Sequence, residues 1–325
     1  MRHAHRRILQ QAALIAAVLF APPGDSAWSQ TGRPLKLVVP YTPGGGTDIL
    51  ARLLSEQIGR TQRVAMVVEN RPGAGTVIGT EAASRAAPDG TTVLITDGTF
   101  VIKPHLQRLN YDPLTSFEPI CNLVHTLPLI AVNSESPYRT LADLINAARM
   151  RPGELSLASD GPGTSHHIAV EMFKRAVKVD MIYIPFPGGA PTVNALLGQH
   201  VTSVLLNYPV LAEQIKAGRL RALATTLRAR TEPLGEVPTV VESGYEDYVV
   251  DLSWGAFVPA KTPKDVIYRL SGWFTAALQA PDLQPKLAVQ GFYPVGTCGT
   301  EFATSVRKEY DEYGRAIHEA NIRAE

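Results

Sequence analysis

The chain has 325 residues, of which 45% are hydrophobic, and its 31 Lys and Arg against 30 Asp and Glu give a formal net charge of +1. This balance leaves no basic footprint and argues against nucleic acid as a partner. The two cysteines, Cys121 and Cys298, form no CxxC and no metal-ligand spacing. They predict neither a zinc site nor a disulfide framework, and they are either bridged to each other or two buried free thiols.

The N-terminus is predicted to be a signal peptide, residues 1–30. Met1 to Arg7 is basic, Ile8 to Ala21 is mostly apolar, and Pro22 to Gln30 is small and polar, which is the order of regions in such a peptide. The apolar run is shorter than the roughly 20 residues that span a bilayer. We therefore expect export, cleavage after Ser29 or a few residues earlier, and a soluble mature protein.

Short apolar runs then alternate with amphipathic stretches. Strands are predicted at 35–41, 64–69, 92–96, 130–132, 155–158, 180–184, 203–206 and 222–225. Helices are predicted at 47–59, 76–86, 141–149, 164–176, 190–198 and 210–217, followed by 263–279, 281–289 and 300–320. Strands separated by helices of this length indicate βαβ units and parallel sheets, so the predicted fold class is α/β.

A glycine turn follows the first strand and opens the first helix. Backbone N–H groups converge on an anion at such a place, and glycine lets the ligand come close. No Lys follows the glycines and the G-x-G-x-x-G spacing is absent, which favours a carboxylate over a nucleotide. Asp48 either stabilises the helix N-terminus or faces the ligand. The candidate ligand-binding residues here are Tyr41, Thr42, Gly44, Gly45, Gly46, Thr47 and Asp48.

The same pattern of strand, glycine turn and helix start recurs at 155–169, and a third such turn spans 185–191. Two anion loops facing each other would clamp a small acid. The histidines after the second turn are expected to be the only nearby groups that become cationic near neutral pH, because neither loop contains Lys or Arg. The candidate residues outside the first turn are Thr99, Gly163, Thr164, Ser165, His166, Gly188 and Asn207.

At these turns the sequence resembles the Bug (TctC-like) family, the periplasmic solute-binding receptors of tripartite tricarboxylate transporters. The resemblance runs through most of the mature chain in order, in the segments 40–48, 69–75, 88–90, 111–113, 161–167, 185–191, 237–239 and 254–255. It implies a two-domain periplasmic-binding-protein type II fold with a ligand cleft between the domains. Pro187 replaces a frequent Lys of the family and Asn207 a frequent Asp, so the bound acid is not implied.

The resemblance also implies carboxylate capture and delivery to membrane permease subunits by a monomer without cofactor. From the order of the motifs and the change of pattern near Trp254, we expect domain 1 to hold 31–128 and 254–325, and domain 2 to hold 129–253. Catalytic residues are not expected, because no G-x-S-x-G elbow and no paired carboxylates occur. A metal site is not expected, because His166 and His167 are adjacent on a helix and point about 100° apart, and no Cys or carboxylate stands at ligand spacing. An exported enzyme acting on a small acid and a ligand-sensing receptor for a signalling partner remain the alternatives.

Overall fold

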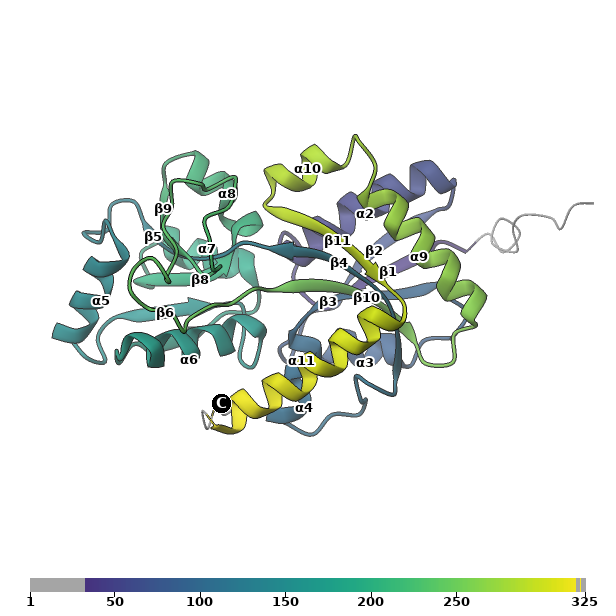
Figure 1. The fold of residues 1–325 in the computed structure, drawn as a ribbon, viewed down its shortest axis with the longest axis horizontal. Coiled ribbons are helices and arrows are strands. Elements are labelled where there is room, and N and C mark those ends of the chain that lie inside the picture. Colours follow the sequence, from purple (N-terminus) through teal and green to yellow (C-terminus); the bar gives the residue numbers. More distant parts are fainter. Residues whose placement is uncertain (1–32, 320–321, 323–325) are drawn as a thin grey trace, which may run out of the picture. The chain divides into compact units, whose positions relative to one another are not determined.

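Two mixed β-sheets organise the part of the chain that the computed structural model describes, residues 33–319 and 322 (Figure 1). The predicted signal peptide lies outside the described residues. Within them, no helix combines the length and the apolar character that a membrane crossing requires. The predicted α/β fold class is confirmed.

The first sheet has six strands in the order β11-β4-β10-β3-β1-β2. Its strands are β1 (Leu35–Val39), β2 (Met66–Asn70), β3 (Thr92–Asp97), β4 (Phe117–Thr126), β10 (Ser253–Pro259) and β11 (Phe292–Cys298). The helices between and after these strands are α2 (Gly46–Gln62), α3 (Val77–Ser84), α4 (Thr99–Leu106), α9 (Lys264–Leu278), α10 (Gln284–Val289) and α11 (Thr300–Glu319).

The second sheet has five strands in the order β7-β6-β8-β5-β9. Its strands are β5 (Pro128–Asn133), β6 (Ser156–Ser159), β7 (Ile182–Pro185), β8 (Ser203–Asn207) and β9 (Leu220–Thr225). Its helices are α5 (Leu141–Met150), α6 (Ser165–Val177), α7 (Gly189–Leu197) and α8 (Tyr208–Lys216). Both faces are covered: Leu157 and Leu205 pack in one apolar cluster with α5 and α6, and Val204 and Leu206 pack in another with α7 and α8. Burial on both faces explains why these strands are continuous apolar runs.

The expectation of parallel sheets is wrong for part of each sheet. β10 pairs antiparallel with β3 and β4, and β5 pairs antiparallel with β8 and β9. The strands β4, β10 and β11 were not predicted, because Pro119, Gly255 and Pro294 interrupt their apolar patterns and register shifts bend their ladders. The sequence reasoning also missed α4. Since Leu127 alone separates β4 from β5, the chain passes between the sheets without a helix.

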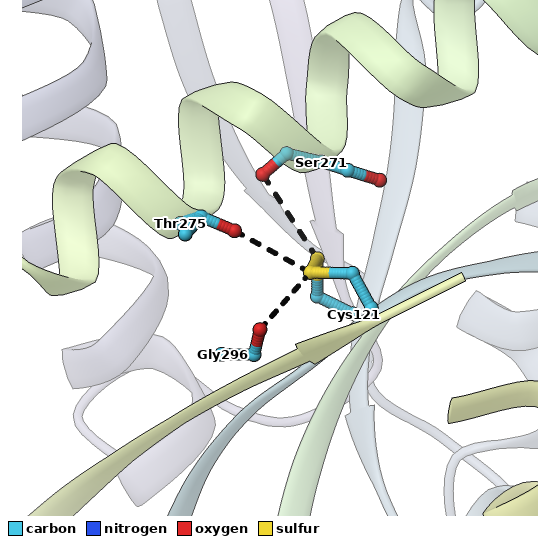
Figure 2. Close-up of a disulfide and its surroundings, with 5 residues drawn as sticks. Cys121, Ser271, Thr275 and Gly296 are labelled. Atoms are coloured by element: carbon cyan, nitrogen blue, oxygen red, sulfur yellow. Dashed lines mark hydrogen bonds between the residues drawn. A yellow bond between two sulfur atoms is a disulfide. The ribbon is translucent and has the colours of Figure 1, made fainter. Parts of the chain in front are cut away.

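Cys121 and Cys298 form a disulfide, which decides between the two alternatives that the sequence left open. The two residues are direct cross-strand partners of β4 and β11. Helix α9 lies beside the bond, with Oγ1 of Thr275 3.4 Å from Sγ of Cys298 (Figure 2). The bond therefore joins β11, the last strand in the described part of the chain, to β4, which leads into the second sheet.

Candidate functional site

Two cavities lie where the glycine turns of both sheets meet, and Tyr41 and Asp160 line both of them. The outer cavity has a volume of about 260 Å³. It is lined by Pro40, Tyr41, Thr42, the segment 72–76, Asp160, Gly161, Pro162 and the segment 185–188. The inner cavity, of about 10 Å³, has room for about one water molecule. It is lined by Tyr41, Gly45, Gly46, Thr47, Asp97, Asp160, His166, Gly189, Leu206, Asn207, Val210 and Trp254.

The first glycine turn is held in shape by Asp48. Its Oδ2 accepts the N–H of Gly44 at 2.9 Å and Nε of Arg52 at 2.9 Å, and its Oδ1 accepts Nδ2 of Asn70 at 2.9 Å. Burial alone would raise the pKa of Asp48, but its hydrogen bonds lower this pKa below the ordinary value. The hydrogen bond from Arg52 lowers it most. Both carboxylate oxygens are thus occupied by the protein, and Asp48 lines neither cavity. The geometry favours the structural interpretation of this residue.

The N-terminus of α2 faces the inner cavity. Gly46 and Thr47 stand in the first turn of α2, where backbone N–H groups have no intrahelical acceptor, and both line that cavity. Nε1 of Trp254 donates to Oγ1 of Thr47 at 2.7 Å, so β10 fixes the hydroxyl. The groups that remain available to a ligand at this helix start are therefore backbone N–H donors.

The second glycine turn is organised by Thr164 and His167. Oγ1 of Thr164 caps α6 by accepting the N–H of His167 at 3.2 Å. Nδ1 of His167 accepts the N–H of Gly163 at 2.9 Å, and its ring stacks on Tyr183 with the ring centres 4.0 Å apart. Burial lowers the pKa of His167 to about 4, so the ring is neutral at physiological pH. His167 therefore shapes the loop and carries no charge there.

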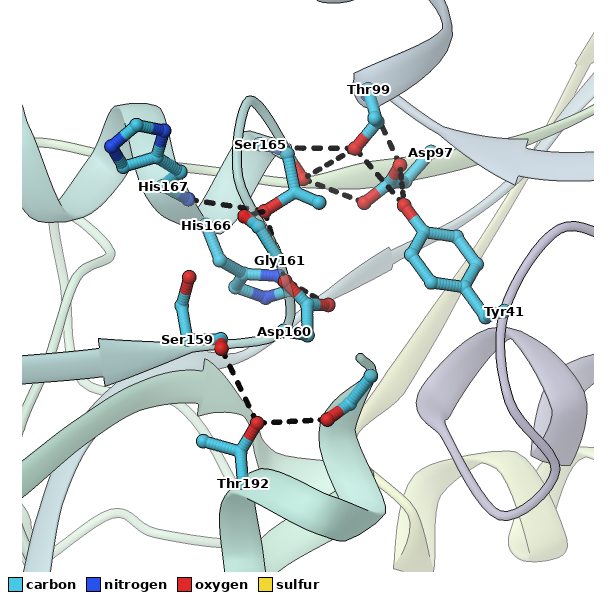
Figure 3. A network of polar contacts seen from close by, with 12 residues as sticks. Tyr41, Asp97, Thr99, Ser159, Asp160, Gly161, Ser165, His166, His167 and Thr192 are labelled. Carbon is cyan, nitrogen blue, oxygen red and sulfur yellow. Dashed lines mark hydrogen bonds and ion pairs between the residues drawn. The ribbon is translucent and has the colours of Figure 1, made fainter. Parts of the chain in front are cut away.

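Asp97, which the sequence reasoning did not select, connects the two loops (Figure 3). Its Oδ1 accepts the hydroxyl of Tyr41 at 2.7 Å and the N–H of Thr99 at 3.0 Å, and its Oδ2 accepts Oγ of Ser165 at 2.6 Å. Oγ1 of Thr99 accepts the N–H of Ser165 at 3.0 Å. Burial, followed by the charge of Asp97, raises the pKa of Tyr41 far above its usual value, so Tyr41 stays a donor.

His166 and Asp160 form a buried pair beside the inner cavity, with Nδ1 3.0 Å from Oδ2. Burial alone would lower the pKa of His166, but the charge and hydrogen bond of Asp160 outweigh it and raise this pKa above its ordinary value. Nε2 of His166 and Oδ1 of Asn207 are buried and make no well-formed hydrogen bond among the described residues. The two side chains lie near enough to each other for Asn207 to help raise the pKa of His166. Buried polar atoms left unpaired cost free energy, so these two atoms are candidates for contact with a ligand or a water.

Lys103 on α4 overturns the expectation that the histidines are the only cations near the loops. Its side chain is 2% exposed, and Nζ donates to the carbonyl oxygen of Pro162 at 2.6 Å. A Cβ on Gly163 would lie 2.8 Å from this Nζ. The earlier expectation was wrong because it considered only charges within the loops, whereas this lysine comes from a helix that the sequence reasoning missed.

The third glycine turn closes against the first. Gly188 has φ +117°, and a Cβ on it would lie 2.1 Å from Oγ1 of Thr42, so only glycine permits this approach. Oγ1 of Thr42 is buried without a partner within the described part of the chain. Both residues line the outer cavity.

The fourteen predicted ligand residues thus divide into two groups. Those lining a cavity are Tyr41, Thr42, Gly45, Gly46, Thr47, His166, Gly188 and Asn207. Those that support the loops and line neither cavity are Gly44, Asp48, Thr99, Gly163, Thr164 and Ser165. Asp97 and Asp160 were missed although Asp97 ends β3, Asp160 directly follows β6, and each precedes a glycine, the same signal that revealed the loops. Lys103 lies inside an apolar helix and had no such signal.

Comparisons with known proteins agree with this architecture. The family model described as the tripartite tricarboxylate transporter family receptor matches residues 50–322. Protein BugT of Bordetella pertussis (strain Tohama I) is 31% identical over 302 residues, which cover 92% of this chain and 92% of BugT. The solved structure of the periplasmic binding protein BugD has 32% sequence identity and a TM-score of 0.85, and covers 90% of this chain and 98% of BugD. The structure of R. palustris Rpa4515 with adipate has 29% identity and a TM-score of 0.87, and covers 90% of this chain and 99% of that one.

Proposed function

Because the chain belongs to the tripartite tricarboxylate transporter receptor family, we propose that it captures a carboxylate-bearing small molecule at the glycine loops and delivers it to the permease subunits of such a transporter. The family and its structural neighbours are periplasmic solute-binding proteins rather than enzymes. Adipate is the molecule bound to the neighbour Rpa4515, and a small organic acid is the ligand class that we extend to this chain.

One observation carries the proposal: the N-terminus of α2 and Nε2 of His166 border the same inner cavity. The helix start offers backbone donors and the positive end of its dipole. Since Asp160 favours the charged form of His166, its Nε2 is a further donor. A carboxylate oxygen in the place of the one water that this cavity admits would accept from these groups and satisfy them, whereas a cationic ligand would not.

The roles of individual residues follow from their positions. We assign ligand contact to the cavity-lining members of the predicted set, with Gly45, Gly46, Thr47 and His166 on the carboxylate. Gly44, Asp48, Thr99, Gly163, Thr164 and Ser165 hold the loops in shape. Asn207 accepts from a hydroxyl or amino group of the ligand, because its unpaired atom is Oδ1.

We further propose that the two sheets belong to two domains, 31–128 with 254–325 and 129–253, which close on the ligand as a hinge. The crossings at Leu127 and just before β10 supply the connections. We propose a monomer that reaches the periplasm by means of the predicted signal peptide. Small-angle scattering with and without ligand tests the closure, and an unchanged radius of gyration with a tightly bound acid would contradict it.

The test of function is a thermal-shift screen of organic acids against the purified protein, with mass spectrometry of any molecule that copurifies. A ligand at 100 times its Kd stabilises the fold by about 2.7 kcal/mol. Recovery of the bound acid unchanged supports a binding protein. Chemical conversion of the acid would support the enzyme alternative, and a screen in which no acid stabilises the protein would contradict the proposal.

A further inference from the structure

A buried ammonium group lies between two glycine turns. Lys103 is 2% exposed, and its Nζ occupies a space that side chains on Gly75 and Gly163 would fill, since ideal Cβ atoms there would lie 2.4 and 2.8 Å from it. Gly75 and Gly163 have φ of +55° and +64°. Two backbone turns in a conformation that favours glycine thus make room for this one amine.

The charge of Lys103 has no carboxylate partner in the described part of the chain. No described Asp or Glu oxygen lies within ion-pair distance of Nζ, and Asp160 is already paired with His166. Burial lowers the pKa of Lys103 to about 8, so at neutral pH most molecules still carry the charge. A buried charge without a counter-ion is costly, and a ligand is a source of one.

Residues that lie against Lys103 also line the outer cavity. Gly75, Thr76 and Pro162 line that cavity, and Pro162 is the residue whose carbonyl accepts from Nζ. Thr76 precedes α3 and is 2% exposed, and its Oγ1 is buried without a partner among the described residues. The hydroxyl of Thr76, the N-cap residue of α3, therefore lies at one end of the outer cavity, and a buried cation lies behind Gly75 and Pro162 at the same end.

We propose that this end of the outer cavity is a second anion subsite, in which the hydroxyl of Thr76, at the positive end of α3, holds an anionic group of the ligand and the Lys103 ammonium compensates its charge. The proposal rests on the proposed function, because it assigns a second acidic group to the same ligand. It places that group apart from the inner cavity, so the ligand is an acid with two separated carboxylates.

The test compares Lys103→Gln and Lys103→Met with Lys216→Gln, which removes an exposed lysine on α8. Calorimetry measures the affinity for succinate, adipate and citrate, and for the monocarboxylates butyrate and hexanoate. In the native chain we expect at least one of the first three acids to bind at least tenfold more tightly than both monocarboxylates. Both Lys103 variants should lose at least tenfold for that acid and little for monocarboxylates, whereas Lys216→Gln should match the native chain.

Different results contradict either the second subsite alone or the proposed function as well. A Gln variant that restores full affinity while the Met variant does not would mean that Lys103 acts only as the donor to Pro162, and this overturns the subsite. Equal binding of monocarboxylates and dicarboxylates by the native chain also overturns it but leaves the proposed function intact. If no carboxylate binds, the proposed function fails as well.

If the variants do not fold, a measurement on the native chain tests whether the charge of Lys103 contributes to ligand binding. Affinity for the preferred dicarboxylate should fall as pH rises from 7 to 9.5, because deprotonated Lys103 no longer compensates the ligand. His167, the titratable neighbour on α6, is neutral throughout this range. His166 faces the inner cavity, and repeating the titration with His166→Gln removes its contribution. A flat profile in both proteins would overturn the proposal.

Discussion

Oγ of Ser165 lies 2.6 Å from Oδ2 of Asp97, and this buried bond joins the first residue of α6 to the last residue of β3. The same carboxylate accepts from Tyr41 and from the N–H of Thr99. One acidic side chain thus connects the strand ends of the first sheet to the helix start that follows the second glycine turn. The relative position of the two loops depends on it.

Replacement of Asp97 by Asn should lower the free energy of unfolding by about 1–3 kcal/mol, because an amide NH₂ cannot accept from the Ser165 hydroxyl. Urea unfolding of Asp97→Asn, Ser165→Ala and the double variant measures this loss. Since the two residues are in contact, we expect their effects to be non-additive by about 0.5–3 kcal/mol. Strict additivity would show that the bond contributes nothing to stability.

The unfolding free energy should decrease as pH falls from about 6.5 to about 4, partly through His167. Its pKa is lowered to about 4 in the folded chain against about 6.5 in the unfolded chain. His167 therefore contributes about 3 kcal/mol to the free energy of unfolding above pH 6.5. This contribution is lost between about pH 6.5 and 4, because the unfolded chain takes up the proton first. His167→Phe, which keeps a ring beside Tyr183, should flatten this part of the pH profile. His200→Phe at an exposed position is the control, and parallel profiles for all three proteins would contradict the assignment.

Two glycines of the loops should respond differently to valine. Gly163→Val should destabilise the fold by about 2–4 kcal/mol, because φ is +64° and the new Cβ would meet Lys103 and Leu106 at 2.8 and 2.9 Å. Gly45→Val should keep stability within about 1 kcal/mol, because φ is −78° and the nearest atom to its Cβ lies at 3.4 Å. The Gly45 variant should instead weaken carboxylate binding, which calorimetry measures. Unchanged affinity in a folded Gly45→Val protein would remove the first turn from the ligand site.

Removal of the disulfide should lower the free energy of unfolding by about 2–5 kcal/mol, since the bond closes a sequence separation of 177 residues. Denaturant unfolding of the Cys121→Ala, Cys298→Ala double variant, compared with the reduced native chain, measures the loss. Affinity for the preferred acid should not change, because neither cysteine lines a cavity of the site. A loss of affinity without a loss of stability would contradict the assignment of the disulfide to stability rather than to ligand binding.

The periodicity of the sequence predicted the strands that are apolar throughout and the helices with a clear apolar face. β8, for example, is buried along its whole length, and α5 has Thr140 and Asp143 as a complete capping box. The pattern failed at β4 and β10, where Asn122, His125 and Gly255 stand among apolar residues in the middle of the first sheet. Their strand conformation is imposed by antiparallel neighbours from distant parts of the chain, which local spacing does not reveal.

The candidate site was predictable where it is local in sequence. The first two glycine turns were identified because strand, glycine and helix follow one another directly. Asp97 bonds to Tyr41, 56 positions away, and Lys103 bonds to Pro162, 59 positions away. Contacts of this kind depend on the packing of whole elements, so local spacing does not reveal which distant residues Asp97 and Lys103 contact.

The sheets also differ in how much of the chain must exist before they are complete. The strands of the second sheet, β5 to β9, follow one another without interruption, whereas the first sheet combines β1 to β4 with β10 and β11 from the other end of the chain. During synthesis from the N-terminus, the second sheet therefore has all its strands while the first still lacks a central and an edge strand. Until β10 arrives, β3 and β4 expose unpaired edges. The first sheet thus depends on contacts of high sequence separation, and its exposed edges are where premature association between nascent chains would begin.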